Sequence, residues 1–326
     1  MNAWLLLLLG LTLLLVGGGM LVRGASSLAH SLGVPSLVIG LTVLAFGTSA
    51  PELAVNVAAA WKGNGAITFG NVFGSNIANI GLIIGLTAAI TALRVHRSIV
   101  TREIPVMLVV TAAAILLASD SWYRDAPDSI DRHDGVLLLV AFAAFLFITT
   151  RSALRDRRRD PVLQEAEQEE QAHPPLAWWA ASALTLAGLA GVLLGSDWTV
   201  DGASQVAARM GMSEAVIGLT AVALGTSLPE LTTSLFAALK GHPDLALGNI
   251  VGSNIFNLLF ILGVSSSIRA VPVPQPGGRQ DLLAVALFSA ILLPFALSQR
   301  KVVRVEGIAL LTAYVAYMVW RTLQPS

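Results

Sequence analysis

Two glutamates stand inside stretches that are otherwise apolar enough to lie within a membrane. Glu52 belongs to GTSAPEL and Glu230 to GTSLPEL, each directly after a proline. A charge at mid-membrane costs roughly 3 kcal/mol, and a proline inside a helix costs about as much because it breaks the hydrogen-bond ladder. The pattern indicates that a bound cation neutralises each glutamate and that each proline leaves backbone oxygens free to face that cation.

Further polar residues recur at helical spacing around both glutamates. Spacings of three and four place them on one helical face, so hydroxyls accompany each glutamate and a second polar stripe follows in the next apolar segment. The two halves of the chain contribute Thr48, Ser49, Asn71, Ser75 and Asn79, and then Thr226, Ser227, Asn249, Ser253 and Asn257. The ligands are all oxygen, without imidazole or sulfur. With two carboxylates, such a set suits calcium better than magnesium, and the neutral oxygens suit sodium.

Composition places these motifs in a membrane protein. Of the 326 residues, 55% are hydrophobic and 12% are charged, and the mean hydropathy is +0.74. Such values are typical of integral membrane proteins, so a lipid bilayer is the expected environment. The net charge of zero gives no reason to expect a nucleic-acid partner, and the lack of cysteine excludes disulfides, thiolate metal sites and cysteine catalysis.

Ten apolar segments are long enough to cross a bilayer core, which takes about 20 helical residues. The first segment lacks a basic leading region and a small-x-small cleavage site, so it is interpreted as a span and not as a signal peptide. We predict an all-α integral membrane protein with ten transmembrane helices, near residues 3–22, 36–61, 67–92, 104–120, 135–150, 177–197, 214–239, 244–268, 281–298 and 302–320.

An internal duplication relates the two halves of the chain. Residues 38–86 align without a gap onto residues 216–264, at an offset of 178, and 25 of the 49 aligned positions are identical. Five spans separate equivalent helices, and because five is odd the two copies cross the membrane in opposite directions. We therefore predict two inverted five-helix repeats, 1–150 and 177–326, joined by the charged loop 151–176. Inverted repeats with helices broken at corresponding places are typical of secondary transporters.

The distribution of basic residues predicts the orientation. The face that holds the central loop collects 13 of the 20 Lys and Arg residues. By the positive-inside rule, loop 151–176 is cytoplasmic and both termini lie outside a cell (inner) membrane.

Other polar groups have simpler interpretations. Thr42 is expected to bond back to its own helix, as isolated hydroxyls in spans usually do. The aspartates between residues 120 and 134 are expected to form a solvated external loop, with weak attraction of cations as the alternative. The glycine pairs in GNVFG and GNIVG fit close helix packing.

The paired motifs GTSAPEL with GNVFGSNIAN and GTSLPEL with GNIVGSNIFN resemble those of the sodium/calcium exchangers of the cation/calcium antiporter superfamily, prokaryotic type. The resemblance covers the ten-span layout. It implies that the two glutamates bind both calcium and sodium, that the hydroxyls bind sodium, and that the last Asn of each GSNxxN completes the centre. Carried over by match, the implied ligands are Glu52, Thr48, Ser49, Ser75 and Asn79, then Glu230, Thr226, Ser227, Ser253 and Asn257, with the backbone carbonyls of Ala45 and Ala223. Some prokaryotic members carry Asp where this chain has Asn257.

We therefore predict a transporter and not an enzyme: an antiporter that exchanges calcium for sodium by alternating access, with electrogenic exchange and without a cofactor. A calcium/proton antiporter of the same superfamily is the main alternative, although such proteins typically have an Asn-Ala type sequence where this chain has Thr-Ser. An intramembrane hydrolase lacks support because the chain has no GxGD-type motif, and a passive cation channel would show flux that does not depend on a counter-ion. The sequence does not predict ion stoichiometry, potassium dependence or oligomeric state.

Overall fold

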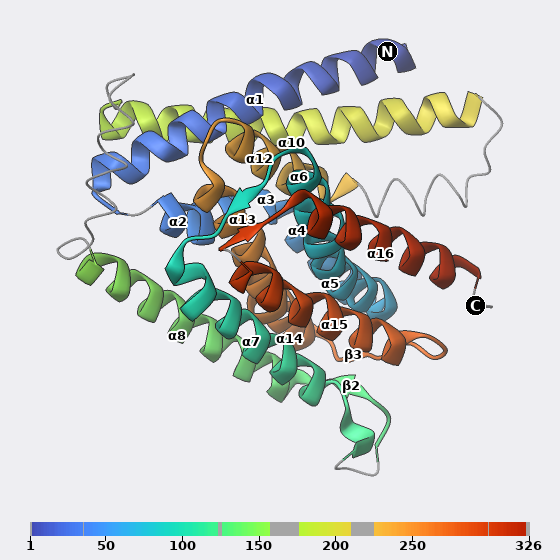
Figure 1. Ribbon diagram of the computed structural model, residues 1–326. Helices are drawn as coiled ribbons and strands as arrows, with labels where there is room; N and C mark the ends of the chain where they lie inside the picture. Colours follow the sequence, from blue (N-terminus) through green and yellow to red (C-terminus); the bar gives the residue numbers. More distant parts are fainter. Residues whose placement is uncertain are drawn as a thin grey trace. The chain divides into compact units, whose positions relative to one another are not determined.

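The computed structural model describes residues 2–34, 36–122, 126–156, 176–209, 225–298 and 300–323, almost all of them helical (Figure 1). The chain divides into two compact units. The first unit comprises Met1–Thr48 and Ala144–Asn249, and the second comprises Ser49–Ala143 and Ile250–Ser326. Each unit therefore takes one part from each half of the chain.

The first unit is built around two long helices, α1 and α10, which lie side by side (Figure 1). The helix α12 packs against both of them and against α3. Buried leucine, valine, isoleucine and alanine side chains of these helices form the core. The helical elements are α1 (Ala3–Leu32), α2 (Ser36–Ile39), the π-helical η1 (Gly40–Leu44), α3 (Ala45–Thr48), α10 (Trp178–Arg209) and α12 (Leu228–Leu239), with the first half of α13 (Pro243–Phe256), up to Asn249, and the second half of α8 (Arg132–Asp156), from Ala144.

Glycines bring the backbones of α1 and α10 into direct contact. At Gly10, Gly17 and Gly24 of α1, an added Cβ would lie within 2.8 Å of a backbone nitrogen of α10. Gly188 and Gly195 of α10 meet backbone nitrogens of α1 at similar distances. Within a membrane, where apolar side chains gain little from packing on each other compared with lipid, this close approach holds helices together through van der Waals contact.

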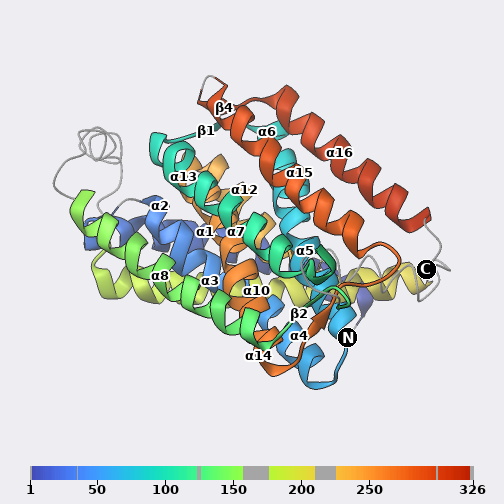
Figure 2. The ribbon, with the colours of Figure 1, turned by 90° about the horizontal axis from the view of Figure 1, so that it is seen from below.

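The second unit is centred on α5, which contacts α4, α14 and α15. Figures 1 and 2 both show α7 beside α15, while α16 packs on α6. The helical elements of the second unit are α4 (Ala50–Trp61), α5 (Gly65–Ala78), η2 (Asn79–Ile84), α6 (Gly85–Ile90), η3 (Ile99–Glu103), α7 (Ile104–Leu117), η4 (Asp120–Trp122), α8 (Arg132–Asp156) up to residue 143, η6 (Asn257–Ile261), α14 (Leu262–Ile268), α15 (Gly278–Leu297) and α16 (Arg304–Leu323).

Two short antiparallel strand pairs, which were not predicted, tie connecting segments together in the second unit. The strand β1 (Leu93–Arg94) pairs with β4 (Lys301–Val302), and β2 (Ser129–Ile130) pairs with β3 (Val271–Pro272). Leu93 lies opposite Val302, and Ile130 lies opposite Val271. Each pair thus joins one strand from the first half of the chain to one from the second half.

Seven described helices are long and apolar enough to cross a membrane, and an eighth span results if the bent pair Ser36–Thr48 and Ala50–Trp61 is counted as one. They cover eight of the ten predicted spans. Of the other two, α16 coincides with span 302–320 but is not among these candidates, and span 214–239 lies partly outside the described residues, where α12 is its described part.

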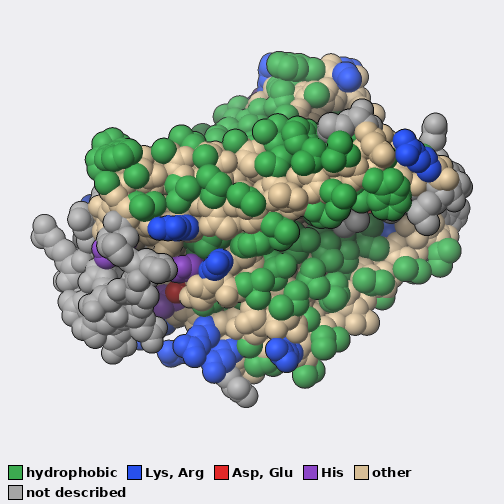
Figure 3. Space-filling view, turned by 90° about the horizontal axis from the view of Figure 1, so that it is seen from above, with side chains coloured by type: hydrophobic (Ala, Val, Ile, Leu, Met, Phe, Trp, Pro, Cys, Tyr) green, Lys and Arg blue, Asp and Glu red, His purple; other side chains and the backbone are tan. Residues whose placement is uncertain are grey.

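Large hydrophobic side chains are exposed on α1 and α10. Hydrophobic side chains cover much of the face seen in Figure 3. Exposure of this kind is expected where a helix faces lipid instead of water. The exposed side chains include Trp4, Leu8, Leu11 and Leu15 of α1 and Trp178, Trp179, Leu186 and Leu194 of α10.

Candidate ion-binding site

The helix of the first GTSxPE motif breaks at the predicted place. The α3 helix ends at Thr48, Ser49 serves as the N-cap of α4 with φ −84° and ψ 10°, and Pro51 lies in the first turn of α4. The two helical pieces are bent by 47°. Proline is tolerated here because the first helical residues have no backbone acceptor for an N–H group in any case.

The second GTSxPE motif repeats this local geometry. Ser227 is the N-cap of α12 with φ −93° and ψ −1°, and Pro229 lies in its first turn. Glu52 and Glu230 therefore occupy the same position, the first turn of a helix that follows a break. Both glutamates are 1% exposed. A carboxylate at a helix N-terminus benefits from the helix dipole, and the nearby free backbone groups make the break a polar place inside an apolar segment.

Six of the predicted ligands lie in the second unit, at the start of α4, on α5, at the end of α13 and at the first residues of η2 and η6. They are Ser49, Glu52, Ser75, Asn79, Ser253 and Asn257, and all are buried. The hydroxyl groups of Ser49 and Ser253 are 3.2 Å apart. Asn257 donates from Nδ2 to Ser75 Oγ at 3.0 Å. Asn79 donates from Nδ2 to Oδ1 of Asn254 at 3.0 Å.

The amide oxygens of Asn79 and Asn257 have no hydrogen-bond partner among the residues that the structure describes. Both are buried, and buried acceptors of this kind are rare unless a cation or a water molecule binds them. Each of the two residues also begins a π-helical segment, η2 and η6 respectively. Single π turns inside α-helices are frequent at functional sites. The hydrogen bonds that fix the Nδ2 atoms leave the Oδ1 atoms as the free ends of both amides.

The first unit holds Ala45, Thr48, Thr226, Ser227 and Glu230 of the predicted set. Thr48 is fully buried and its Oγ1 lies 3.0 Å from the Leu44 carbonyl and 3.3 Å from Asn249 Oδ1. Ser227 Oγ is buried without a hydrogen-bond partner in the described ranges, while Thr226 is half-buried. Ala45 is buried at the start of α3, and Ala223 lies outside the described residues.

Asn249 links two other polar residues of this unit. It donates from Nδ2 to Ser234 Oγ at 3.0 Å, and its Oδ1 faces the Thr48 hydroxyl. The sequence placed Asn249 on a polar stripe but did not single out Ser234. In contrast, Thr42 donates to the Val38 carbonyl at 2.6 Å, as expected for a hydroxyl that only bonds back to its own helix.

Asn56, Asn76 and Asn254 were also missed as buried polar groups. Each is at most 1% exposed. The signal that could have found Asn56 is its place four residues after Glu52, which puts both on one face of α4. Asn76 and Asn254 are the Asn residues of the two GSN triplets.

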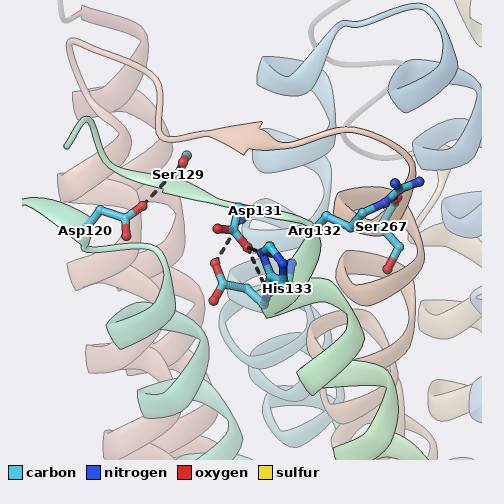
Figure 4. A network of polar contacts seen from close by, with 7 residues as sticks. Asp120, Ser129, Asp131, Arg132, His133 and Ser267 are labelled. Atoms are coloured by element: carbon cyan, nitrogen blue, oxygen red, sulfur yellow. Dashed lines mark hydrogen bonds and ion pairs between the residues drawn. The ribbon is translucent and has the colours of Figure 1, made fainter. Parts of the chain in front are cut away.

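The acidic segment after α7 is less solvated than expected, since Asp120 and Asp134 are buried. Figure 4 shows the polar contacts around Asp120 and Asp131. Asp131 Oδ1 accepts from the backbone nitrogens of His133 and Asp134, and Asp134 Oδ2 accepts from that of Asp131. This reciprocal pair is a capping box at the start of α8. Arg132 donates to the Ser267 carbonyl at 2.9 Å. Asp131 and Asp134 therefore serve to begin a helix, whereas Asp120 accepts a hydrogen bond from the Ser129 hydroxyl at 3.4 Å.

Asp128 of the same segment fastens α15. It accepts hydrogen bonds from the Ser121 backbone at 2.8 Å and from Arg279 Nε at 2.9 Å. The Ser121 hydroxyl, with the Arg279 guanidinium beside it, holds the pKa of the Asp128 carboxyl below its usual value. Asp125 lies outside the described residues.

In both units the predicted ligands offer oxygen atoms to an ion. In the described parts of the chain no three His, Asp or Glu side chains come together as a metal site. The motifs that contain the glutamates instead carry serine and threonine hydroxyls, and the following helices carry asparagine amides. This chemistry fits hard cations that exchange between water and protein, such as calcium and sodium, better than transition metals.

Comparisons with known proteins point in the same direction. Residues 2–151 and 180–323 match the family described as sodium/calcium exchanger protein. The chain is 40% identical over 318 residues to the putative antiporter CaxA of Alkalimonas amylolytica, covering 97% of each protein. It is 34% identical to the sodium/calcium exchanger MaX1 of Methanosarcina acetivorans, again over 97% of each. Among solved structures, it is similar to the sodium-calcium exchanger NCX_Mj soaked with sodium and calcium, with a TM-score of 0.83, 32% identity and 100% coverage of both chains.

Proposed function

Because this chain belongs to the sodium/calcium exchanger protein family, a family of membrane antiporters, we propose that it exports calcium in exchange for sodium. The observation that carries the proposal is the repeated break. In both halves a serine occupies the N-cap position of a helix, a proline follows in its first turn, and a glutamate in that turn is buried. Two buried carboxylates in equivalent local settings offer negatively charged oxygen ligands to a hard cation, and their combined charge equals that of one calcium ion.

The proposed roles follow from the chemistry of each group. Glu52 and Glu230 bind calcium and sodium in turn. The amide oxygens of Asn79 and Asn257, which have no hydrogen-bond partner in the described ranges, add neutral ligands. The remaining proposed ligands are hydroxyls and carbonyls that bind sodium, namely Thr48, Ser49, Ser75, Thr226, Ser227 and Ser253, with the carbonyls of Ala45 and Ala223.

For the architecture, we propose ten transmembrane helices in two inverted five-helix repeats, 1–150 and 177–326, which alternate access to the ions. The 25 identities in 49 aligned positions support the duplication. The strands support it as well, because β1 and β3 begin at Leu93 and Val271, 178 positions apart, which is the offset of the repeats. Motion of one repeat against the other around a fixed site is the mechanism typical of such proteins.

For the orientation, we propose that loop 151–176 is cytoplasmic and that both termini lie outside the cell (inner) membrane. The support is the excess of Lys and Arg on one face, 13 of 20.

The decisive experiment measures calcium uptake into proteoliposomes while sodium, potassium or proton gradients are imposed one at a time. Uptake driven by an outward sodium gradient is the expected result. Uptake that follows a pH gradient and ignores sodium would instead establish calcium/proton antiport, the alternative within the superfamily. Uptake that needs no counter-ion gradient at all would indicate a channel and overturn the proposal.

A further inference from the structure

The two repeats differ one helical turn beyond the glutamates. Asn56 follows Glu52 in α4, whereas Ser234 follows Glu230 in α12, in otherwise aligned segments. A spacing of four places each residue on the same helical face as its glutamate. Helical side chains also lean toward the N-terminus, so Asn56 and Ser234 lean toward the turn that carries the glutamate.

Hydrogen bonds fix the Asn56 amide through its nitrogen. Nδ2 donates to the backbone carbonyl of Glu52 at 2.7 Å and to Oδ1 of Asn71 on α5 at 2.5 Å. An asparagine amide has two N–H groups, so both are used. Because these bonds hold the plane of the amide, the oxygen cannot exchange places with the nitrogen without losing both.

The oxygen of the Asn56 amide is not used in these hydrogen bonds. Asn56 is 0% exposed, and its Oδ1 has no hydrogen-bond partner in the part of the chain that the structure describes. A buried amide oxygen without a donor is unfavourable unless something else satisfies it, and a cation does so. At the equivalent place in the second half, Ser234 has a hydroxyl instead of an amide, and its Oγ accepts a hydrogen bond from Asn249 Nδ2, so the two half-sites differ in chemistry.

We propose that Asn56 is a further calcium-binding residue, which supplies a neutral oxygen beside Glu52 that Ser234 does not match beside Glu230. The inference rests on the proposed function, since calcium is the ion it names. Calcium takes six to eight oxygen ligands and accepts asparagine carbonyls among them. Sodium is served by the hydroxyls of both repeats, so the extra oxygen favours calcium.

If Asn56 only holds α4 and α5 together, substitutions at Asn56 and Asn71 should affect calcium binding in a different order. The bond from Asn56 to Asn71 clasps α4 to α5, and any change that breaks the clasp would disturb the site. Asn56→Ser shortens the side chain and gives the first repeat the residue of the second. Asn56→Asp loses the clasp but keeps an oxygen and adds a negative charge. Asn71→Ser breaks the clasp and leaves the Asn56 oxygen in place.

The test compares these three variants with the parent protein by equilibrium calcium binding in detergent and by calcium-induced shifts in the melting temperature. We expect Asn56→Ser to weaken calcium binding roughly tenfold, as loss of a metal-site group commonly does. Asn56→Asp should bind calcium more tightly than the parent, and Asn71→Ser should change binding less than Asn56→Ser. If all three variants weaken binding by similar factors, Asn56 is a clasp and the inference is wrong. Unchanged binding in Asn56→Ser overturns it as well.

Flux measurements on the same preparations separate this inference from the proposed function. If the parent does not exchange calcium for sodium in vesicles, the proposed function fails, while the binding series in detergent still decides the role of Asn56. If the parent exchanges the two ions and the variants do not differ in the expected order, only the assignment of Asn56 fails. A parent that binds no calcium contradicts both.

Discussion

Asn257 donates a hydrogen bond to the Ser75 hydroxyl at 3.0 Å, although 182 residues separate them in the chain. Both side chains are buried, and both belong to GSN-containing motifs of opposite halves. The bond occupies the amide nitrogen of Asn257 and leaves its oxygen without a hydrogen-bond partner in the described ranges. Ser75 thereby orients the proposed ligand Asn257 of the other half, and its own hydroxyl oxygen is a proposed sodium ligand.

The first prediction concerns this pair. Ser75→Ala removes a proposed sodium ligand and the acceptor that orients Asn257, but it leaves both carboxylates in place. We expect the sodium concentration for half-maximal calcium transport to rise severalfold, with a smaller change for calcium. The measurement is sodium-dependent calcium flux in proteoliposomes, with Thr42→Val as the control, because Thr42 bonds only to its own helix. Equal shifts for sodium and calcium would speak against a sodium site at Ser75.

The second prediction concerns the carboxylates. Glu52→Gln or Glu230→Gln removes one of the two proposed negative charges and should abolish exchange, since calcium would then be left half neutralised. Glu52→Asp and Glu230→Asp keep the charge on a shorter arm and should weaken exchange without abolishing it. Calcium flux in vesicles, normalised to the amount of folded protein, checks both. Near-parental flux in either Gln variant would remove that residue from the site.

The third prediction concerns the contact between α1 and α10. A Cβ at Gly188 would lie 2.3 Å from the Leu21 backbone nitrogen, so Gly188→Ala must push the helices apart. We expect a destabilisation on the order of 1–3 kcal/mol, the usual cost of overpacking. Gly19→Ala is the matched control, because a Cβ at Gly19 has open space, and alanine favours a helix by up to about 1 kcal/mol over glycine. Thermal unfolding in detergent distinguishes them, and equal melting temperatures would contradict the close contact.

The fourth prediction concerns orientation. The chain has no cysteine, so Gln168→Cys and Ser326→Cys can be labelled without background. We expect an impermeant maleimide added to intact cells to label the cysteine at 326 and to reach the one at 168 only after the membrane is opened. Labelling of position 168 from outside would reverse the proposed orientation.

Much of the candidate site was predictable because its residues break local rules. A proline and a glutamate inside an apolar segment are costly, and the helix does break within the GTSAPE motif, with Ser49 as the N-cap of the next helix. The family assignment from the same motifs is confirmed by the match over residues 2–151 and 180–323. The burial of Asp134 was not predictable, because the residue type alone does not distinguish an aspartate that caps a helix from one that is exposed to solvent.

Other features depend on contacts between distant segments, which local patterns do not contain. The π-helical turns at Asn79 and Asn257 follow residues that look like ordinary helix formers, and the two-residue strands are too short to give a periodic signal. Asn56 stands in an unremarkable AVNVA stretch, and only its hydrogen bonds to Glu52 and Asn71 show that its oxygen is left over. The sequence thus predicted the glutamates together with Asn79 and Asn257 as ligands, but it did not single out Asn56.

The last prediction is that transport moves net charge. With asparagine at both 79 and 257, the proposed ligands carry two negative charges, which one calcium ion balances. The hydroxyls of both repeats, together with the carboxylates, offer oxygen sets for more than two sodium ions, so the sodium-loaded state would be net positive. One half of the cycle then feels the membrane potential, at about 2.3 kcal/mol per charge per 100 mV. Calcium uptake into sodium-loaded vesicles should accelerate when potassium and valinomycin make the interior positive, because that potential drives sodium out. Asn257→Asp offers a matched test: with three sodium ions, a third ionised carboxylate would make the sodium-loaded state neutral and the calcium-loaded state singly negative, so the charge should move in the calcium half of the cycle while the net charge moved per cycle stays the same. If potentials of either sign leave the initial rate of the parent unchanged at non-saturating ion concentrations, the exchange is electroneutral and the charge count is wrong.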